Sequence, residues 1–453
     1  MASEEQIIST KNQLVEWLEA GCKPKQKWRI GTEHEKFPFR HQAHTPIAYE
    51  GSNGIKALLE SMQEQTGWEG IFEAGNIIGL TDPVSGGAIS LEPGGQFELS
   101  GAPLKNLHET CSEVHTHLAQ LREAADPLDI GFLGMGYTPD WKREDIPKMP
   151  KGRYKIMSNY MPKVGQKGLD MMYRTCTVQV NVDFASENDM VKKLRASLAL
   201  QPLATALFAN SPFKEGKPSG ALSLRSQAWL DTDADRTGML DFVFEDGFGF
   251  ERYTDYAVQV PMYFIYDKGN YQDVTGNRFI DFFNGKLAGF EKTPVTEQHW
   301  SDHLTTIFPE ARIKRYMEMR GADGGPWKRL CALPAFWVGL LYDDTALDAA
   351  WDVAKNWTAE QRNQLRIDVT EKGLKAKIGK FELSDIAQHI LEISSHGLTS
   401  RNNLDSRGES EAHFLDDLKE IVKNKETEAD KLLRLYENQW QRDISNIYTN
   451  HAY

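Results

Sequence analysis

Cysteine is scarce in this chain of 453 residues, and long apolar runs are missing. Four cysteines without a C-x-x-C pair rule out a disulfide scaffold or a zinc ribbon. The longest apolar runs, such as 332–342, are too short and interrupted to span a bilayer. The first residues, Met-Ala-Ser-Glu-Glu-Gln, lack the hydrophobic region of a signal peptide and the arginines of a transit peptide. We therefore expect a cytosolic protein with no membrane partner.

An excess of positive charge is missing too. The chain has 52 Lys and Arg against 65 Asp and Glu, a net charge of −13. A general nucleic-acid binder would need a basic face, so no nucleic-acid partner is expected. Small anionic substrates remain possible where positive charge is concentrated locally. There is no G-x-x-x-x-G-K-[ST] segment, so any nucleotide is not held by a P-loop, and there is no G-x-S-x-G elbow.

The domain organisation is read from a change of pattern late in the chain. From about residue 344 onward the sequence is helical and charged, and no internal repeat or linker separates it from what precedes. We interpret 1–343 as the core. The region 344–453 is then a helical region packed on that core, and not an independent domain.

The most informative stretch is RIGTEHEKFPF at 29–39, where apolar and polar residues alternate as in a strand. Successive side chains of a strand point to opposite faces, so Glu33 and Glu35 share one face and His34 lies on the other. Two neighbouring carboxylates repel each other unless a cation lies between them or one is protonated. A lone E-x-E of this kind is usually an exposed edge strand.

The same spacing recurs on three further predicted strands. A Pro-Gly-Gly turn at 93–95 separates Glu92 from the pair Gln96 and Glu98. The strand 173–184 places Gln179 and Asn181 on one face, and the strand 312–320 does so for Glu318 and Arg320. Four converging polar pairs, with apolar residues opposite, predict a concave polar site.

The residue types in this site indicate its chemistry. Five carboxylates without recurrent His or Cys select a hard cation, Mg²⁺ or Mn²⁺, over Zn²⁺. Arg320 beside them would neutralise charge on a transferred phosphoryl group. The pair His115 and His117 falls on a predicted helix, where side chains two residues apart diverge, so we interpret it as a surface feature.

The segment 148–167 carries six basic residues and no acidic one. It is predicted to be either an anion-binding loop or lid, or a solvated surface loop. The sequence does not choose between these two.

Five segments carry a resemblance to a known family: RIGTEHEKF at 29–37, SLEPGGQFELSGAP at 90–103, MPKGRY at 149–154, TCTVQVNVDF at 175–184 and RYMEMRGADGGPWKRLCALP at 315–334. Together they resemble the plant and proteobacterial type of glutamate–cysteine ligase, from about residue 20 to the C-terminus. The resemblance implies an α+β fold like that of glutamine synthetase, in which a strongly curved antiparallel sheet forms a funnel flanked by helices. It also implies formation of γ-glutamylcysteine, the first step of glutathione synthesis, from glutamate, cysteine and ATP through a γ-glutamyl phosphate.

The resemblance further implies roles for individual residues. Mg²⁺ would be held by Glu33, Glu35, Glu92, Glu98 and Glu318, with Gln179 standing where related ligases often carry a metal-binding His. Arg320, Glu35 and Glu318 would be catalytic. Arg225 and Trp229 would hold the α-carboxylate of glutamate, whereas Arg153, Tyr154 and Tyr263 would line the cysteine side. Tyr263 falls in an aromatic segment, 258–266, that is predicted to be a strand. For these five residues, core packing or loop anchoring is a competing interpretation.

Cys111 and Cys331 both lie in apolar surroundings, so by default each is a buried, inert thiol. In plant members of the resembled family, a regulatory disulfide joins cysteines at the two matching places. Their Cα atoms would have to lie within about 7 Å for such a bridge to form. The pair is therefore a possible redox pair.

Three alternatives stay open beside the leading hypothesis. A ligase that joins glutamate to a different amine would share the carboxylates and differ only in its acceptor pocket. A non-catalytic metal- or nucleotide-binding relative would be free to lose some of these carboxylates, yet all are present. A kinase or phosphatase with a two-metal site is disfavoured because the motifs match a ligase across most of the chain. The protein is expected to be a monomer or a homodimer.

Overall fold

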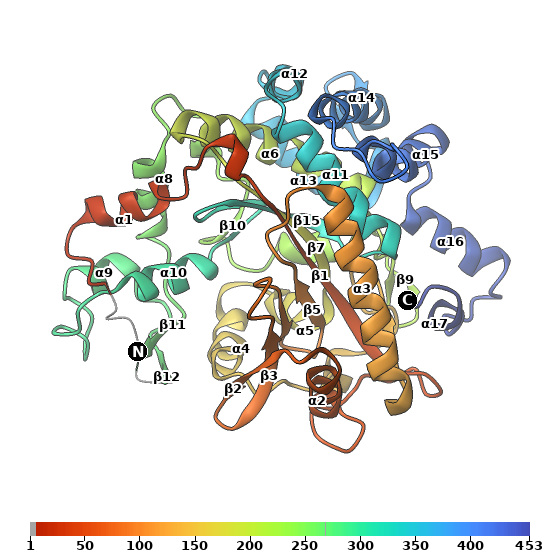
Figure 1. Cartoon of the computed structure of the whole chain (residues 1–453), viewed down its shortest axis with the longest axis horizontal. Coiled ribbons are helices and arrows are strands. Elements are labelled where there is room, and N and C mark those ends of the chain that lie inside the picture. The colour runs from red at the N-terminus through yellow and green to blue at the C-terminus, as the bar shows by residue number, and fades with distance from the viewer. Residues whose placement is uncertain (1–5, 268) are drawn as a thin grey trace.

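The computed structural model describes residues 6–267 and 269–453, and a nine-stranded antiparallel sheet lies at its centre (Figure 1). Eight strands follow one another in the order β14 (Ala311–Ile313), β15 (Met317–Asp323), β7 (Thr177–Val182), β1 (Ile30–Arg40), β5 (Phe97–Ser100), β4 (Ala88–Leu91), β3 (Asn76–Thr81) and β2 (Glu69–Glu73). The ninth, β6 (Ile130–Leu133), pairs with the second half of β1. The sheet is open, with β14 and β2 at its two ends.

Strand β1 organises the sheet because its first half is hydrogen-bonded on both sides. Glu33 pairs with Gln179 of β7 and with Ser100 of β5, and Glu35 pairs with Glu98. Both glutamates are half-buried, whereas His34 between them is fully buried on the opposite face. The predicted alternation is therefore what the strand shows. We call the face that carries Glu33 and Glu35 the polar face; the opposite face is mostly apolar, although β1 also buries Thr32, His34 and Lys36 there.

The apolar face is covered by three long helices, α3 (Leu107–Ala125), α6 (Glu187–Leu207) and α11 (Trp327–Leu341). Helix α11 contacts β7 and β1, α6 contacts β15, and α3 contacts β1. Val178 and Val180 of β7 are fully buried beneath them. Almost every side chain of α11 is buried, as expected for a helix that is apolar all round.

The polar face is bordered by shorter helices, α4 (Gly152–Val164), α5 (Gly168–Arg174) and α7 (Leu224–Trp229), while α2 (Ile55–Thr66) packs on β3 and α3. The basic segment is thus largely the helix α4, and its prediction as a loop was wrong. Tyr154, Met157 and Met161 recur at three- and four-residue steps and are buried, which explains the helix.

The helices after residue 343 are α12 (Asp344–Ala354), α13 (Ala359–Lys372), α14 (Leu383–Arg401), α15 (Asp416–Asn424), α16 (Glu428–Asn438) and α17 (Asn446–Asn450). Of these, α12 and α13 pack on α6, and α14 packs on α11. Leu365 of α13 and Ile390 of α14 belong to the same hydrophobic cluster as the core of the sheet. In Figure 1, α12 lies at the top, and α14, α15 and α16 follow it down the right side.

The remaining elements surround this centre. The helices are α1 (Lys11–Glu19), α8 (Phe250–Ala257), α9 (Phe279–Phe283) and α10 (Glu297–Thr305), and the 3₁₀ helices are η1 (Lys25–Lys27), η2 (Asp126–Leu128), η3 (Arg143–Asp145), η4 (Asp241–Phe244), η5 (Gly373–Lys375) and η6 (Glu411–Leu415). The short strand pairs are β8 (Phe213–Lys214) with β9 (Lys217–Pro218), β10 (Thr237–Gly238) with β13 (Phe308–Pro309), β11 (Phe264–Asp267) with β12 (Asn270–Asp273) and β16 (Lys377–Ile378) with β17 (Phe381–Glu382).

The expected α+β fold, an antiparallel sheet flanked by helices, is confirmed. Among the described residues no single helix is long and apolar enough to cross a membrane. Helices α11 and α12 together reach that length and composition, but they are bent by 92° at the break between them.

Candidate active site

A cavity of about 400 Å³ opens on the polar face of the sheet. It is lined by strands β1, β5, β7 and β15 and by residues of α4, α5 and α7. Eleven of the predicted site residues lie on its wall: Glu33, Glu35, Glu92, Glu98, Arg153, Tyr154, Gln179, Arg225, Trp229, Glu318 and Arg320. The strand order explains this convergence, because β15, β7, β1 and β5 are direct neighbours.

One wall of the cavity carries three glutamates whose charges are held close together. Burial and the carboxylates of Glu318 and Glu98 raise the pKa of Glu33 to about 7. Burial, followed by the charges of Glu92 and Glu98, raises the pKa of Glu35 well above its ordinary value. Burial and Glu92 likewise raise the pKa of Glu98. A bound cation would relieve this repulsion.

Each of the three carboxylates has one donor that fixes its position. Glu33 Oε1 accepts from Asn181 Nδ2 at 2.8 Å, and Glu35 Oε2 accepts from the Thr177 amide at 2.8 Å. Glu98 Oε2 accepts from Ser90 Oγ at 2.6 Å. The other oxygens of Glu33 and Glu35 are therefore available to a ligand in the cavity.

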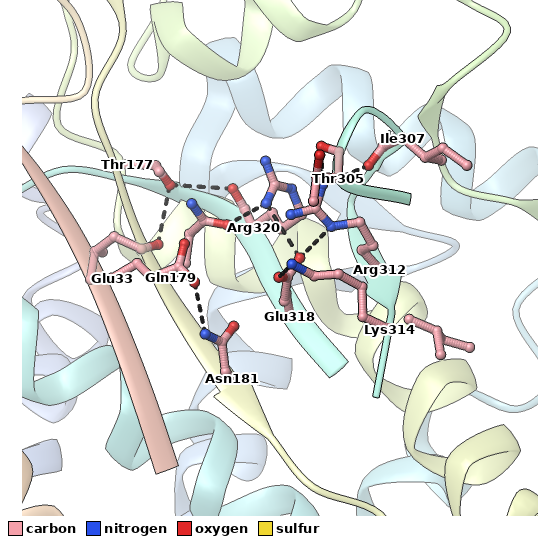
Figure 2. Close-up of polar contacts among 12 residues, drawn as sticks. Glu33, Thr177, Gln179, Asn181, Thr305, Ile307, Arg312, Lys314, Glu318 and Arg320 are labelled. Atoms are coloured by element: carbon pink, nitrogen blue, oxygen red, sulfur yellow. Dashed lines mark hydrogen bonds and ion pairs between the residues drawn. The ribbon is translucent and has the colours of Figure 1, made fainter. Parts of the chain in front are cut away.

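Glu318 differs from these glutamates because three cations surround it (Figure 2). Its carboxylate lies 2.8 Å from Lys314 Nζ and 3.5 Å from Arg320 Nη1, and it also accepts from Arg312 Nε. Burial alone would raise the pKa of Glu318, but these cations hold it well below its usual range. Arg320 Nη1 also donates to Gln179 Oε1 at 2.6 Å, so that amide oxygen is already engaged. The result is a cationic cluster, Arg312, Lys314 and Arg320, on the cavity wall.

Arg225 and Trp229 come from α7 and present nitrogen donors. Arg225 Nη2 donates to the Arg320 carbonyl at 2.8 Å. Arg225 Nε and Trp229 Nε1 are buried and have no partner within the described part of the chain. Buried donors without an acceptor are costly, and because both residues also line the cavity, a small side-chain rotation would bring these donors to an anionic ligand such as a carboxylate.

The opposite end of the cavity is formed by the start of α4. The Tyr154 hydroxyl donates to the Leu91 carbonyl at 2.7 Å and lies 3.3 Å from Glu92 Oε1. Arg153 Nη2 lies 3.4 Å from the same hydroxyl. Burial lowers the pKa of Lys151 to about 8, and its Nζ donates to the Leu91 carbonyl. Met157, Met171 and Met172 complete this end with apolar side chains.

Tyr263 is the predicted substrate-binding residue that the structure does not bring to this wall. It precedes β11, is fully buried, and stacks on the Arg236 guanidinium at 3.8 Å, with its hydroxyl 3.5 Å from Asp233. The predicted strand 258–266 begins only at Phe264.

Sequence reasoning missed Arg312 and Lys314. It predicted one strand over 312–320, where the structure has the antiparallel pair β14 and β15. The signal that could have found them is their spacing: Arg312 and Lys314 lie six and four residues before Glu318, so on the predicted strand they share its face.

The remaining predicted residues lie outside the cavity. Cys111 of α3 and Cys331 of α11 are joined in a disulfide with their Cα atoms 5.5 Å apart, which closes a span of 220 residues. His117 is buried against His34, with ring centroids 5.5 Å apart. The interpretation of His117 as a surface residue was therefore wrong. His115 instead faces the exposed Trp327 ring, 4.9 Å away.

A cavity whose wall carries partly buried carboxylates together with guanidinium groups is typical of an enzyme acting on charged small molecules. Residues 29–450 match the glutamate–cysteine ligase family 2. The chain belongs to this family of ligases, and the resemblance found in the sequence is confirmed.

Named relatives match over nearly the whole chain. The chloroplastic glutamate–cysteine ligase of Nicotiana tabacum is 55% identical over 444 residues, which cover 98% of this chain and 83% of the relative. The chloroplastic enzyme of Brassica juncea is 54% identical over 455 residues, which cover 100% of this chain and 86% of the relative. A crystal structure of glutamate–cysteine ligase from Francisella tularensis, in complex with AMP, has the same fold, with a TM-score of 0.59 and 13% sequence identity. The match covers 94% of this chain and 87% of that structure.

The relatives contradict one expectation. The sequence predicted a cytosolic protein, but the relatives from Nicotiana tabacum and Brassica juncea are named as chloroplastic enzymes. Composition and the first few residues were therefore not sufficient to predict the compartment.

Proposed function

We propose that this chain joins the γ-carboxylate of glutamate to the amine of cysteine, with conversion of ATP to ADP and phosphate. The γ-carboxylate attacks the terminal phosphorus of ATP, which gives a γ-glutamyl phosphate and ADP. The cysteine amine then attacks the acyl carbon, the C–O bond to phosphate breaks, and the amine loses a proton. The observation that carries the proposal is the presence of a carboxylate wall and a cationic cluster within one cavity.

The carboxylate wall supports a magnesium site. Its donors are all oxygens, and the raised pKa values of Glu33, Glu35 and Glu98 indicate negative charge that lacks a counter-ion. Within residues 6–267 and 269–453, no three His, Cys, Asp or Glu side chains are already gathered around one point. Glu33, Glu35, Glu92 and Glu98 would hold Mg²⁺, or Mn²⁺, by small side-chain movements. The ion would neutralise phosphate charge.

The chain's own residues account for the rest of the reaction. Arg225 Nε and Trp229 Nε1 would turn toward the α-carboxylate of glutamate and bind it, which gives these buried donors their acceptors. Arg320 would stabilise the moving phosphoryl group, because Gln179 and Glu318 hold its guanidinium in the cavity.

The contacts of Glu318 support a positioning role more than a metal-binding one. Its carboxylate is already neutralised by three cations, of which Arg312 and Lys314 are also placed to contact phosphate oxygens.

Arg153 and Tyr154 would receive cysteine at the opposite end. The methionines there provide apolar surface for a thiol-bearing side chain. A ligase for a different amine would use the same carboxylates and cations, so this end of the cavity carries the difference.

ADP release by the purified protein tests the proposal. With MgCl₂, ATP and glutamate, release should depend on cysteine, and mass spectrometry should detect γ-glutamylcysteine. Serine, alanine and glycine serve as competing amines at equal concentration. ADP release that does not require any amine would refute the ligase assignment. A preference for another amine would show that this amine, and not cysteine, is the acceptor.

A further inference from the structure

A second cavity, of about 20 Å³, lies directly behind the groups proposed to bind glutamate. It shares Arg225, Trp229 and Arg320 with the active-site cavity. Its other walls include Glu310 and Arg366. Arg366 belongs to α13, so a residue of the C-terminal helical region reaches the back of the active site.

Arg366 contacts two segments that carry active-site residues. Its Nε donates to Glu310 Oε1 at 2.5 Å, and its Nη2 lies 3.4 Å from the carbonyl oxygen of Trp229. Both charged side chains are largely shielded from water, with exposed fractions of 16% for Arg366 and 14% for Glu310. A charge-assisted hydrogen bond in such surroundings is stronger than one at the surface, and its planar donor group fixes direction as well as distance.

Glu310 transmits this contact to Arg320. Its backbone carbonyl accepts from the Arg320 amide at 3.1 Å. The pairing of β15 with β7 is irregular between Met319 and Ala322, so Arg320 and Gly321 sit at a break in the register. The other carboxylate oxygen of Glu310 lies against Gly321, where a Cβ would meet it at 2.7 Å. Glu310 therefore packs on the irregular segment that directs Arg320 into the cavity.

We propose that Arg366 is a positioning residue, which holds Trp229 and Arg320 at a fixed separation through one guanidinium group. The inference rests on the function proposed above, in which these two residues bind glutamate and stabilise the phosphoryl group. A displacement of about 1 Å between reacting groups is enough to lower turnover by up to about a hundredfold. The region 344–453 is thereby part of the catalytic unit.

The test compares two arginines of the same helix. Arg366→Gln removes the charge and one arm of the contact, and it should lower kcat/KM for glutamate at least tenfold while changing KM for cysteine less than threefold. Arg362→Gln is the matched control, because Arg362 lies one turn earlier, is 6% exposed and pairs with Asp241 away from both cavities. The control should lose as much thermal stability but keep its kinetic constants.

Two further variants separate positioning from general loss of structure. Arg366→Lys keeps the charge but cannot reach both partners, so its kcat/KM for glutamate should lie between those of wild type and Arg366→Gln. If the contact acts through Glu310, the double variant of Glu310→Gln with Arg366→Gln should be no worse than the poorer single variant. Equal kinetic losses for Arg362→Gln and Arg366→Gln, or additive losses in the double variant, would overturn the inference.

Protection by glutamate against thermal unfolding gives a readout that does not depend on the acceptor. Wild-type protein should gain stability in glutamate, Arg362→Gln should keep the gain, and Arg366→Gln should lose most of it. A wild-type protein without ligase activity but with this pattern would refute the proposed reaction and leave the positioning role standing. Full glutamate protection in Arg366→Gln would refute the role alone.

Discussion

Glu33 and Glu318 face the same cavity, yet replacing each by Gln should change stability in opposite directions. Burial, followed by the charges of Glu318 and Glu98, raises the pKa of Glu33 from 4.5 to about 7. Each unit of difference is worth about 1.4 kcal/mol, so at pH 8 the ionised Glu33 destabilises the fold by about 3 kcal/mol. Water in the cavity screens part of this, and we expect Glu33→Gln to stabilise the metal-free protein by about 2 kcal/mol.

The sign of this effect sets its pH range. Below pH 4.5 the Glu33 carboxyl is protonated in both the folded and the unfolded protein and costs no stability. Because its folded-state pKa is raised, that stability is lost as the pH rises from 4.5 through about 7. The gain from Glu33→Gln should therefore be near zero at pH 4.5 and complete at pH 8. Glu33→Gln keeps an oxygen for the bond from Asn181, so the comparison isolates the charge.

Glu318→Gln removes the counter-charge of three cations instead. Arg312, Lys314 and Arg320 would then repel one another in a buried site, and breaking a buried ion pair on one side costs about 3–5 kcal/mol. Urea denaturation in EDTA at pH 8, under one redox condition, measures the free energy of unfolding of both variants and of wild type. Loss of stability in Glu33→Gln, or no loss in Glu318→Gln, would refute this account of the site's electrostatics.

Three further predictions concern activity and pH. Glu35→Gln should fold normally but lose about a hundredfold in ADP release, and near-normal release would remove Glu35 from the metal-binding set. Arg320→Lys keeps the charge but not the planar fork, so turnover should fall much more than magnesium affinity, and the reverse pattern would assign Arg320 another role. Burial lowers the pKa of His303 to about 3, so between pH 7 and pH 5 the unfolded chain takes up a proton that the folded protein excludes, and the free energy of unfolding should fall by about 2 kcal/mol. This loss should shrink in His303→Phe, because phenylalanine does not titrate and its ring would keep the packing on Phe279. An unchanged pH dependence in denaturation curves of His303→Phe would contradict that assignment.

The composition of the site was predictable because strand alternation fixes which residues share a face. The pairs containing Glu33, Glu98, Gln179 and Glu318 were found on this basis, and the structure places their strands side by side. Alternation says nothing about which strands are neighbours, since that depends on pairing between distant segments. The sequence therefore predicted no strand order, and the neighbours of each strand are known from the structure.

Arg312 and Lys314 of the cationic cluster were missed for a local reason. The turn between β14 and β15 is made by Lys314, Arg315 and Tyr316, none of which is a typical turn residue, so the segment looks like one continuous strand. The hairpin places Arg312 directly opposite Glu318. The contact of Arg366 with Glu310 was not predictable either, because it joins residues 56 positions apart in regions with different patterns.

The central strand β1 also limits how the chain length can change. A single-residue insertion or deletion within 30–32 would turn every later side chain of the strand to the opposite face. His34 would then point into the cavity and the glutamates into the helix layer, although no side chain had been altered. The turn at 82–87 has no such limit, since Val84 is 93% exposed there. Length variation in this protein is thus expected to be tolerated in such turns and excluded from the strand.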